Sequence, residues 1–182
     1  MAPTSPRYVP SERLAKLLDD LPRSPPRVGV FQDAAVDDVR AWLERLPLDI
    51  VQLHGRETVA DIERLGPARC WKMFSLERAA DLEPLMGSPA ALVLVDTVRG
   101  AVRGGTGQPG DWDLAARAAR RRPLVLAGGL RPANVAEAIG RVQPAGVDVS
   151  SGIEAAPGRK DHELLRAFCE AVKSAVAGAR TS

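Results

Sequence analysis

The sequence has no apolar run long enough to cross a membrane. No window approaches the roughly 18 uninterrupted apolar residues of a transmembrane helix, and residues Met1–Pro6 do not combine a basic segment with an apolar one as a secretory signal does. An excess of one charge is also lacking, because 25 Lys and Arg residues and 23 Asp and Glu residues are spread along the chain. Without a basic stripe we expect no nucleic-acid partner, and we expect a cytoplasmic protein without membrane contacts.

Cysteine is scarce as well. The two cysteines, Cys70 in a strand-like segment and Cys169 in a helix-like one, have no metal-ligand spacing. We therefore expect reduced structural thiols, with neither a disulfide nor a metal site. Apolar residues nevertheless make up 45% of the 182 residues, which is enough for one globular domain with a real core, and we expect residues 1–182 to form a single domain.

Strand-like and helix-like segments alternate along the chain. This alternation predicts a parallel β-sheet whose apolar strands are covered on both faces by helices. The predicted strands are Arg27–Phe31, Asp49–Leu53, Cys70–Phe74, Ala91–Val95, Leu124–Ala127 and Gly146–Val149. Helices are expected after the caps Ser11, Asp33 and Asp161, from Thr58 and Asp113, between the last two strands, and in Leu76–Met86 with a break at Pro84.

A closed (βα)8 barrel and an open doubly wound sheet share this alternation. Polar residues favour the barrel, because they fall in or just after the C-terminal halves of their strands, and a barrel brings those ends to one mouth. These residues are Gln52, His54, Lys72, Asp96 and Asp148. The predicted fold class is therefore α/β, of the (βα)8 TIM-barrel type.

Two turns of small residues follow the last two predicted strands, Gly128-Gly129 after the first and Ser150-Ser151-Gly152 after the second. Two such turns side by side can direct several backbone N–H groups at one spot, which is how a phosphate monoester is held in many barrels. Each turn alone is equally consistent with a tight strand-to-helix connection. The pair favours phosphate binding.

At this point the sequence resembles the phosphoribosylanthranilate isomerase family of tryptophan biosynthesis. The motifs that carry the resemblance agree in order and spacing across essentially the whole chain; they are SPRYVPSERL from Ser5, RVGVF from Arg27, VQLHG from Val51, LVDT from Leu94, GGTGQPGDW from Gly104, AGGLRPANV from Ala127 and VDVSSGIEAAPGRKDHELL from Val147. The resemblance implies an Amadori rearrangement of N-(5'-phosphoribosyl)anthranilate without metal or organic cofactor. It implies a small phosphoribosyl substrate as partner and a monomer or homodimer.

The resemblance also implies roles for single residues. Asp96 is the implied general acid, although an Asp that closes a strand is also a routine cap. Arg7 is the implied partner of the anthranilate carboxylate, although an Arg near a terminus is usually a solvated charge. Gln52, His54 and Asp148 are implied substrate-binding residues; by themselves, His54 is consistent with a loop histidine and Asp148 with a carboxylate bonded to backbone N–H groups.

The implied phosphate-binding residues are Gly128, Gly129, Ser151 and Gly152. A glycine-rich loop over the sugar phosphate is implied for Gly104, Gly105, Thr106 and Gly107, which lack the Lys-Ser/Thr of a nucleotide-binding P-loop. Gln108 stands where the family usually has a lysine, which puts any contact of that lysine in doubt.

The family's general base, a cysteine in a Lys-Ile-Cys-Gly-like first strand, matches no segment of this sequence. Cys70 and Cys169 lie in other motifs. We therefore expect an N-terminally truncated, six-stranded portion of the barrel with exposed outer strands, and little or no isomerase activity.

Two other functions remain open at this stage. One is another sugar-phosphate barrel enzyme, such as indole-glycerol-phosphate synthase or a phosphoribosyl isomerase of histidine synthesis, against which Arg7 and Asp96 in these motifs argue. The other is a non-catalytic phosphate-binding barrel remnant.

Overall fold

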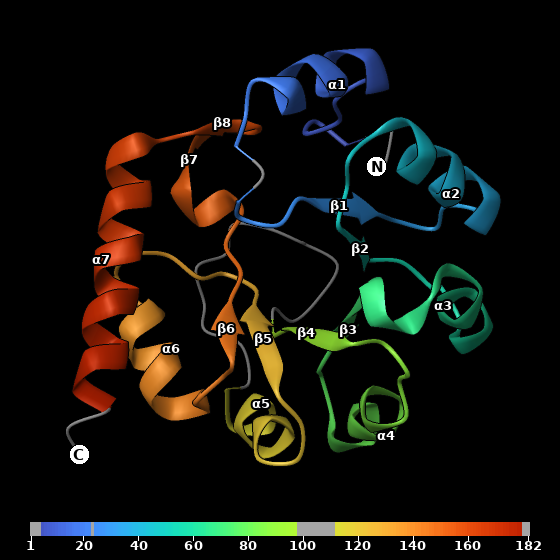
Figure 1. The fold of residues 1–182 in the computed structure, drawn as a ribbon. Helices are drawn as coiled ribbons and strands as arrows, with labels where there is room; N and C mark the ends of the chain where they lie inside the picture. Colours follow the sequence, from blue (N-terminus) through green and yellow to red (C-terminus); the bar gives the residue numbers. More distant parts are fainter. Residues whose placement is uncertain (1–4, 23, 98–111, 180–182) are drawn as a thin grey trace. The chain divides into compact units, whose positions relative to one another are not determined.

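The computed structural model describes residues 5–22, 24–97 and 112–179 of the chain. They form an α/β fold with a six-stranded sheet in the order β1-β2-β3-β4-β5-β6 (Figure 1). The pairs β1–β2, β2–β3 and β5–β6 are parallel, in agreement with the alternation of strands and helices in the sequence. The order has β1 and β6 at its two ends.

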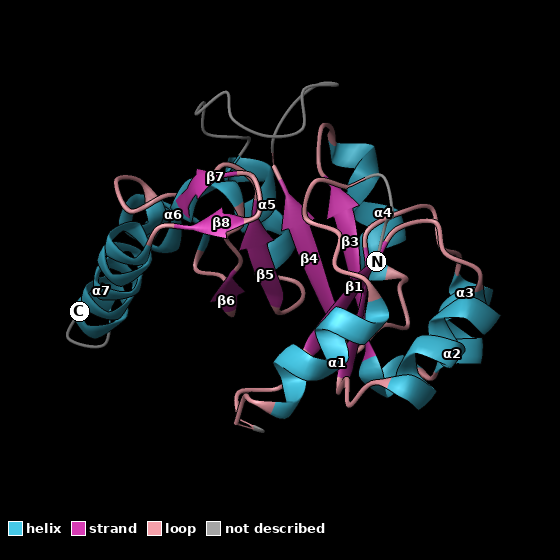
Figure 2. Ribbon diagram, turned by 90° about the horizontal axis from the view of Figure 1, so that it is seen from above, coloured by secondary structure: helices cyan, strands magenta, loops and turns pink. Residues whose placement is uncertain are grey.

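The sheet strands are β1 (Val28–Phe31), β2 (Ile50–Leu53), β3 (Cys70–Ser75), β4 (Leu92–Asp96), β5 (Leu124–Ala127) and β6 (Gly146–Val147). The α-helices are α1 (Ser11–Asp19), α2 (Val36–Arg45), α3 (Val59–Leu65), α4 (Leu82–Met86), α5 (Trp112–Ala119), α6 (Val135–Val142) and α7 (His162–Ala179). Short 3-10 turns occur at Pro67–Arg69, Ala79–Asp81 and Ser151–Ile153. A separate antiparallel hairpin of β7 (Glu154–Ala156) and β8 (Arg159–Lys160) precedes α7 (Figure 2).

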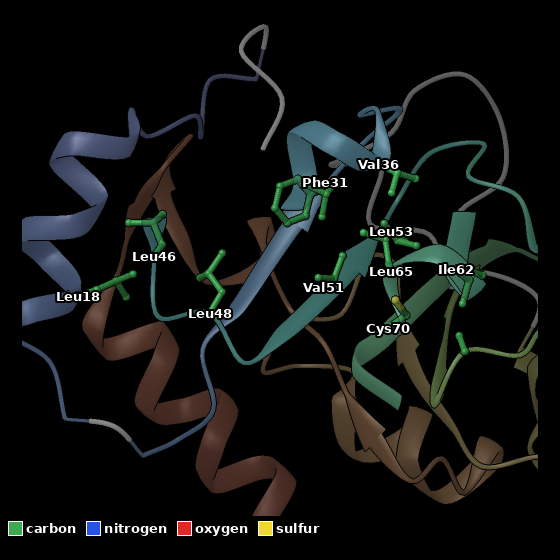
Figure 3. Close-up of a cluster of buried hydrophobic side chains, with 12 residues drawn as sticks. Leu18, Phe31, Val36, Leu46, Leu48, Val51, Leu53, Ile62, Leu65 and Cys70 are labelled. Atoms are coloured by element: carbon green, nitrogen blue, oxygen red, sulfur yellow. The ribbon is translucent and has the colours of Figure 1, made fainter. Parts of the chain in front are cut away.

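The chain divides into two compact units. Unit 1 comprises Met1–Met73 and Ser88–Val93, and unit 2 comprises Phe74–Gly87 and Leu94–Ser182. In unit 1 the core gathers β1 and β2 against α2 and α3, with Phe31, Val51 and Leu53 almost completely buried (Figure 3). The buried Cys70 belongs to the same cluster, as expected for a structural thiol.

Unit 2 has its own core around β5. Leu124 and Leu126 are fully buried, and Val135 of α6 is buried with them. The α5 and α6 helices are joined by Arg141, which donates to both carboxylate oxygens of Asp113 at 3.1 and 3.0 Å. Its guanidinium also lies 6.0 Å from the centre of the buried Trp112 ring. These contacts therefore link α5 to α6, the helix that follows the turn after β5.

The predicted strands are confirmed within one residue at their ends, except that β6 ends at Val147, two residues before the predicted end at Val149. The helix expected from about Thr58 is α3, which begins at Val59 with Thr58 as its cap. Asp161 caps α7 as predicted, because its Oδ1 accepts from the N–H groups of Glu163 at 2.9 Å and Leu164 at 3.0 Å. The Pro157-Gly158 turn of the β7–β8 hairpin was not anticipated, although such a dipeptide is a turn signal.

Three predictions about helix ends were wrong. Asp33 does not cap α2; its φ is +51° and its carboxylate accepts instead from the N–H of Arg56. Pro84 does not break its helix, because it lies in the first turn of α4. A backbone N–H at that position would have no partner within the helix, so the lack of an N–H in proline costs no hydrogen bond. Ser11 is the first residue of α1 rather than its cap, which is Pro10.

The capping box of α3 predicts a pH-dependent stability. Asp61 accepts from the backbone N–H of Thr58 at 2.8 Å, and this bond is the main cause that lowers the pKa of Asp61 from its usual 3.8. A carboxylate with a lowered folded pKa stabilises the fold above its unfolded pKa and loses that contribution as the pH falls through the folded value. We therefore expect Asp61→Asn to lower the urea midpoint at neutral pH, and the difference to shrink below about pH 4.

The measurement is urea unfolding of both proteins from about pH 7 to about pH 2.5. Thr58→Ser, which keeps the backbone N–H and a hydroxyl group to bond with Asp61, is the matched control and should follow the unaltered chain. A midpoint difference that stays constant over this whole pH range would contradict the prediction.

Candidate functional site

In unit 1, the predicted residues Gln52 and His54 lie together at the end of β2. Nε2 of His54 is 2.7 Å from Oε1 of Gln52, and the Gln52 side chain is buried. Because an amide oxygen only accepts, Nε2 of His54 is the donor in this orientation of the amide. The backbone N–H of His54 donates to the carbonyl of Phe31 at 2.8 Å. This bond between the ends of β1 and β2 fixes the position of the His54 backbone.

A buried ion pair supports the turn that follows His54. Nζ of Lys72, on β3, donates to Oε2 of Glu57 at 2.9 Å, and the two side chains are 7% and 4% exposed. The same Nζ donates to the carbonyl of Gly55 at 2.6 Å, and the Gly55 N–H donates to Glu57 Oε2 at 2.9 Å. Glu57 was missed in the sequence, where a Glu just before a helix resembles any solvated residue of a first helical turn.

Gly55 also has no room for a side chain. A Cβ on Gly55 would come within 2.5 Å of the backbone nitrogen and a carboxylate oxygen of Asp33. Asp33 in turn donates its N–H to Glu57 at 2.8 Å. Asp33 has a positive φ, and its hydrogen bonds go to the β2–α3 turn rather than to α2.

Arg7 lies in the turn before α1 and is exposed. Its backbone N–H donates to Oγ of Ser5 at 3.2 Å. The backbone of Arg7 is therefore part of a short local turn of the SPRY motif.

In unit 2, Asp96 ends β4 directly against the first predicted phosphate turn. A Cβ added to Gly128 would overlap Oδ1 of Asp96 and lie 2.9 Å from the backbone nitrogen of Thr97. Gly128 has φ +90°, a conformation that L side chains rarely adopt. Asp96 and the first turn therefore lie side by side.

The first turn is held in shape by Asn134. Its Oδ1 accepts from the N–H of Arg131 at 2.9 Å, and its Nδ2 donates to the carbonyl of Gly129 at 3.1 Å. Gly129 also has a positive φ, +63°. The Asn134 side chain therefore restrains the loop between β5 and α6 at Gly129 and at Arg131.

The second turn meets the first through Gly152. A Cβ on Gly152 would overlap the carbonyl oxygen of Leu130, and it would lie 2.9 Å from the carbonyl carbon. Asp148 stays close to β5 as well, because its N–H donates to the carbonyl of Leu126 at 2.8 Å. The structure thus brings Gly128, Gly129, Ser151 and Gly152 into one neighbourhood with Asp96 and Asp148.

Other predicted features are outside this geometry. Gly104, Gly105, Thr106, Gly107 and Gln108 lie outside the described residues. Among the described residues, no group of three or more His, Cys, Asp or Glu side chains is arranged to hold a metal ion. None of the described helices combines the length and the apolarity needed to span a membrane.

Comparisons with known proteins agree with these motifs. The family model described as N-(5'phosphoribosyl)anthranilate (PRA) isomerase matches residues 1–171. A relative from Syntrophus aciditrophicus (strain SB), named N-(5'-phosphoribosyl)anthranilate isomerase, is 43% identical over 171 residues, which are 94% of this chain and 74% of the relative.

Solved structures are similar as well. The crystal structure of phosphoribosyl anthranilate isomerase from Thermotoga maritima matches with a TM-score of 0.87 and 35% identity, over 94% of this chain and 84% of that one. A structure of the isomerase in complex with reduced 1-(o-carboxyphenylamino)-1-deoxyribulose 5-phosphate matches with a TM-score of 0.82 and 33% identity, over the same shares.

The buried Lys72–Glu57 pair predicts an asymmetric response to mutation. Lys72→Met leaves a buried carboxylate without its cation, and we expect the free energy of unfolding to fall by about 3–5 kcal/mol. The double variant Lys72→Met/Glu57→Gln should regain much of this loss, because no charge is then buried and the new amide oxygen still accepts from backbone N–H groups.

Denaturant unfolding of the three proteins measures these differences. Lys16→Met, at an exposed position of α1, is the control and should change the unfolding free energy by less than about 0.5 kcal/mol. If the double variant is as unstable as Lys72→Met alone, the ion pair is not the cause of the loss.

Proposed function

Because this chain belongs to the N-(5'-phosphoribosyl)anthranilate isomerase family, we propose that it converts N-(5'-phosphoribosyl)anthranilate to 1-(2-carboxyphenylamino)-1-deoxyribulose 5-phosphate in tryptophan biosynthesis. The observation that carries the proposal is the contact between Asp96 and Gly128, since a sugar-phosphate isomerase needs its acid beside its phosphate anchor. We further propose that the α/β fold is of the (βα)8 barrel type. We also propose that the protein is cytoplasmic and is a monomer or a homodimer.

The chemistry needs one proton delivered and one removed. An acid protonates the ribose ring oxygen as the bond between this oxygen and C1 breaks, and the nitrogen lone pair forms a C1=N bond. A base then takes the proton from C2, which gives an enol that rearranges to the ketone. Asp96 is the proposed acid, because it is half-buried at a strand end and adjacent to the turn that would hold the 5-phosphate.

The substrate has an anionic group at each of its two ends, and residues are proposed for both. Gly128, Gly129, Ser151 and Gly152 are the proposed phosphate cradle, and the carboxylate of the anthranilate ring is the proposed ligand of Arg7. Gln52, His54 and Asp148 are the proposed contacts to the rest of the substrate. The Gln52–His54 bond supports this role, because it restrains the orientation of the imidazole ring.

Neither cysteine of the chain has the properties of the base. Burial raises the pKa of the Cys70 thiol, which disfavours the thiolate, and Cys70 is enclosed in the core of unit 1. Cys169 is exposed on α7. We therefore propose neither Cys70 nor Cys169 as the base.

The impaired activity expected from the missing cysteine motif finds no support in the comparisons, and it stays a prediction. The barrel-remnant and synthase alternatives find no support there either. Incubation of the purified chain with fluorescent N-(5'-phosphoribosyl)anthranilate separates the functions: loss of fluorescence with formation of the ketose supports the isomerase, and binding without turnover supports the remnant.

Asp96→Asn tests the proposed acid. The amide keeps the shape of the carboxyl group but supplies no acidic proton, so we expect turnover to fall about 100- to 10,000-fold from that of the unaltered chain. The dissociation constant for reduced 1-(2-carboxyphenylamino)-1-deoxyribulose 5-phosphate should change less than about threefold, since this ligand needs no proton transfer. The exposed Asp20→Asn is the matched control. Full turnover of the Asp96 variant would remove Asp96 from the mechanism.

Arg7→Met tests the proposed carboxylate contact. We expect about tenfold weaker binding of the same reduced ligand, because a charge-assisted bidentate contact is lost. The phenylamino counterpart, which lacks the ring carboxylate, should bind both proteins equally, and Arg7→Lys should recover only part of the affinity. Titration calorimetry measures these affinities. Equal weakening for both ligands would contradict a contact to the carboxylate.

A further inference from the structure

The β7–β8 hairpin of unit 2 follows directly on the second phosphate turn. Glu154 of β7 is paired with Lys160 of β8, and the register of this antiparallel pair is irregular between Glu154 and Ala156. The N–H of Asp161 donates to the carbonyl of Ile153 at 2.9 Å and ties the hairpin to α7. Figure 1 shows this hairpin beside the beginning of α7.

Lys160 has two partners, and one of them is the turn itself. Its Nζ donates to the carbonyl oxygen of Ser150 at 2.8 Å and to Oε1 of Glu154 at 2.9 Å. The Glu154 side chain is 4% exposed, whereas that of Lys160 is 41% exposed. A buried carboxylate thus anchors a cation whose other contact is a backbone carbonyl.

The carbonyl of Ser150 and the N–H of Ser151 belong to the same peptide plane. In a trans peptide these two groups point in opposite directions, so a bond that holds the oxygen also holds the direction of the N–H. A cationic donor polarises the peptide as well and makes the N–H a better donor to an anion. Lys160 therefore acts on the face of this peptide opposite to the one that would meet a phosphate.

The other side of the turn is already closed by backbone. The absence of a Cβ at Gly152 lets the turn approach the carbonyl of Leu130 within contact distance. The segment Ser150–Gly152 therefore has two restraints, the close approach of Gly152 to Leu130 and the bond from Lys160 to Ser150. Of these two restraints, only the second depends on a side chain that can be changed without overlap of backbone atoms.

We propose that Lys160, held by Glu154, is a positioning residue that directs the Ser151 N–H at the substrate phosphate. It acts through the Ser150–Ser151 peptide and does not itself bind the phosphate, because Glu154 already neutralises its charge. The inference rests on the proposed phosphate cradle and adds to it a specific device that sets the affinity for the phosphate group.

A pair of ligands separates this role from a general structural one. The probes are reduced 1-(2-carboxyphenylamino)-1-deoxyribulose 5-phosphate and the same compound without its phosphate. Lys160→Met should weaken binding of the phosphorylated ligand about 5- to 50-fold and leave binding of the other unchanged. Lys160→Arg, which keeps a cationic donor, should restore affinity to within about threefold. Lys173→Met, at an exposed position of α7, is the matched control.

Each other outcome of this titration contradicts the inference. Equal weakening of both ligands would show a structural role, and no change for either would show that Lys160 has none. If the unaltered chain itself does not prefer the phosphorylated ligand, the phosphate cradle and the proposed function fail first. A normal preference that survives Lys160→Met overturns the positioning role alone.

A second measurement uses the unaltered chain and does not depend on the folding of a variant. Titration with inorganic phosphate, followed by 15N and 1H NMR, should shift the Ser151 and Gly152 amide signals while the Lys160 ammonium signal moves little. A shift of the Lys160 ammonium with a stationary Ser151 amide would mean that the lysine binds phosphate directly, and the inference would be wrong.

Discussion

The absence of a Cβ atom at Gly128 and Gly152 is the constraint on which the proposed site depends. At Gly128 it allows the carboxylate of Asp96 to lie against the turn after β5, and at Gly152 it allows the turn after β6 to touch Leu130. Backbone N–H groups make an anion site only when several of them converge, and side chains at these positions would separate the turns. The chemistry proposed for Asp96 therefore follows from close backbone packing.

Both units use a lysine and a glutamate to stabilise a turn after a strand. In unit 1 the pair of Lys72 and Glu57 is buried, and it holds both the carbonyl and the N–H of Gly55 beside His54. In unit 2 the pair of Lys160 and Glu154 holds the carbonyl of Ser150. A charged donor on a carbonyl is a strong restraint in a low dielectric, so each pair gives a short irregular segment the rigidity that a helix or strand would otherwise provide.

Most of the secondary structure was predictable because it is local. The six predicted apolar segments became strands, although β6 is two residues shorter than expected, and the cap at Asp161 was recognised from a residue type that bonds to its own helix. The cap assigned to Asp33 was wrong because its partner, the N–H of Arg56, belongs to a turn 23 residues away in the sequence. The hairpin at Glu154–Lys160 was missed because its strands are too short to show any period.

The sequence by itself determined the family, the α/β alternation and the residue types available for acid chemistry and anion binding, because these depend on local patterns and motif spacing. Only the tertiary structure decided which of these residues meet: Asp96 with Gly128, Gly152 with Leu130, and Lys160 with Ser150. Such contacts join the ends of different elements, and no periodicity along the chain records the distance between two backbones. The side chains that support the turns, Glu57 and Glu154, could therefore be identified only once the strands and turns were assembled.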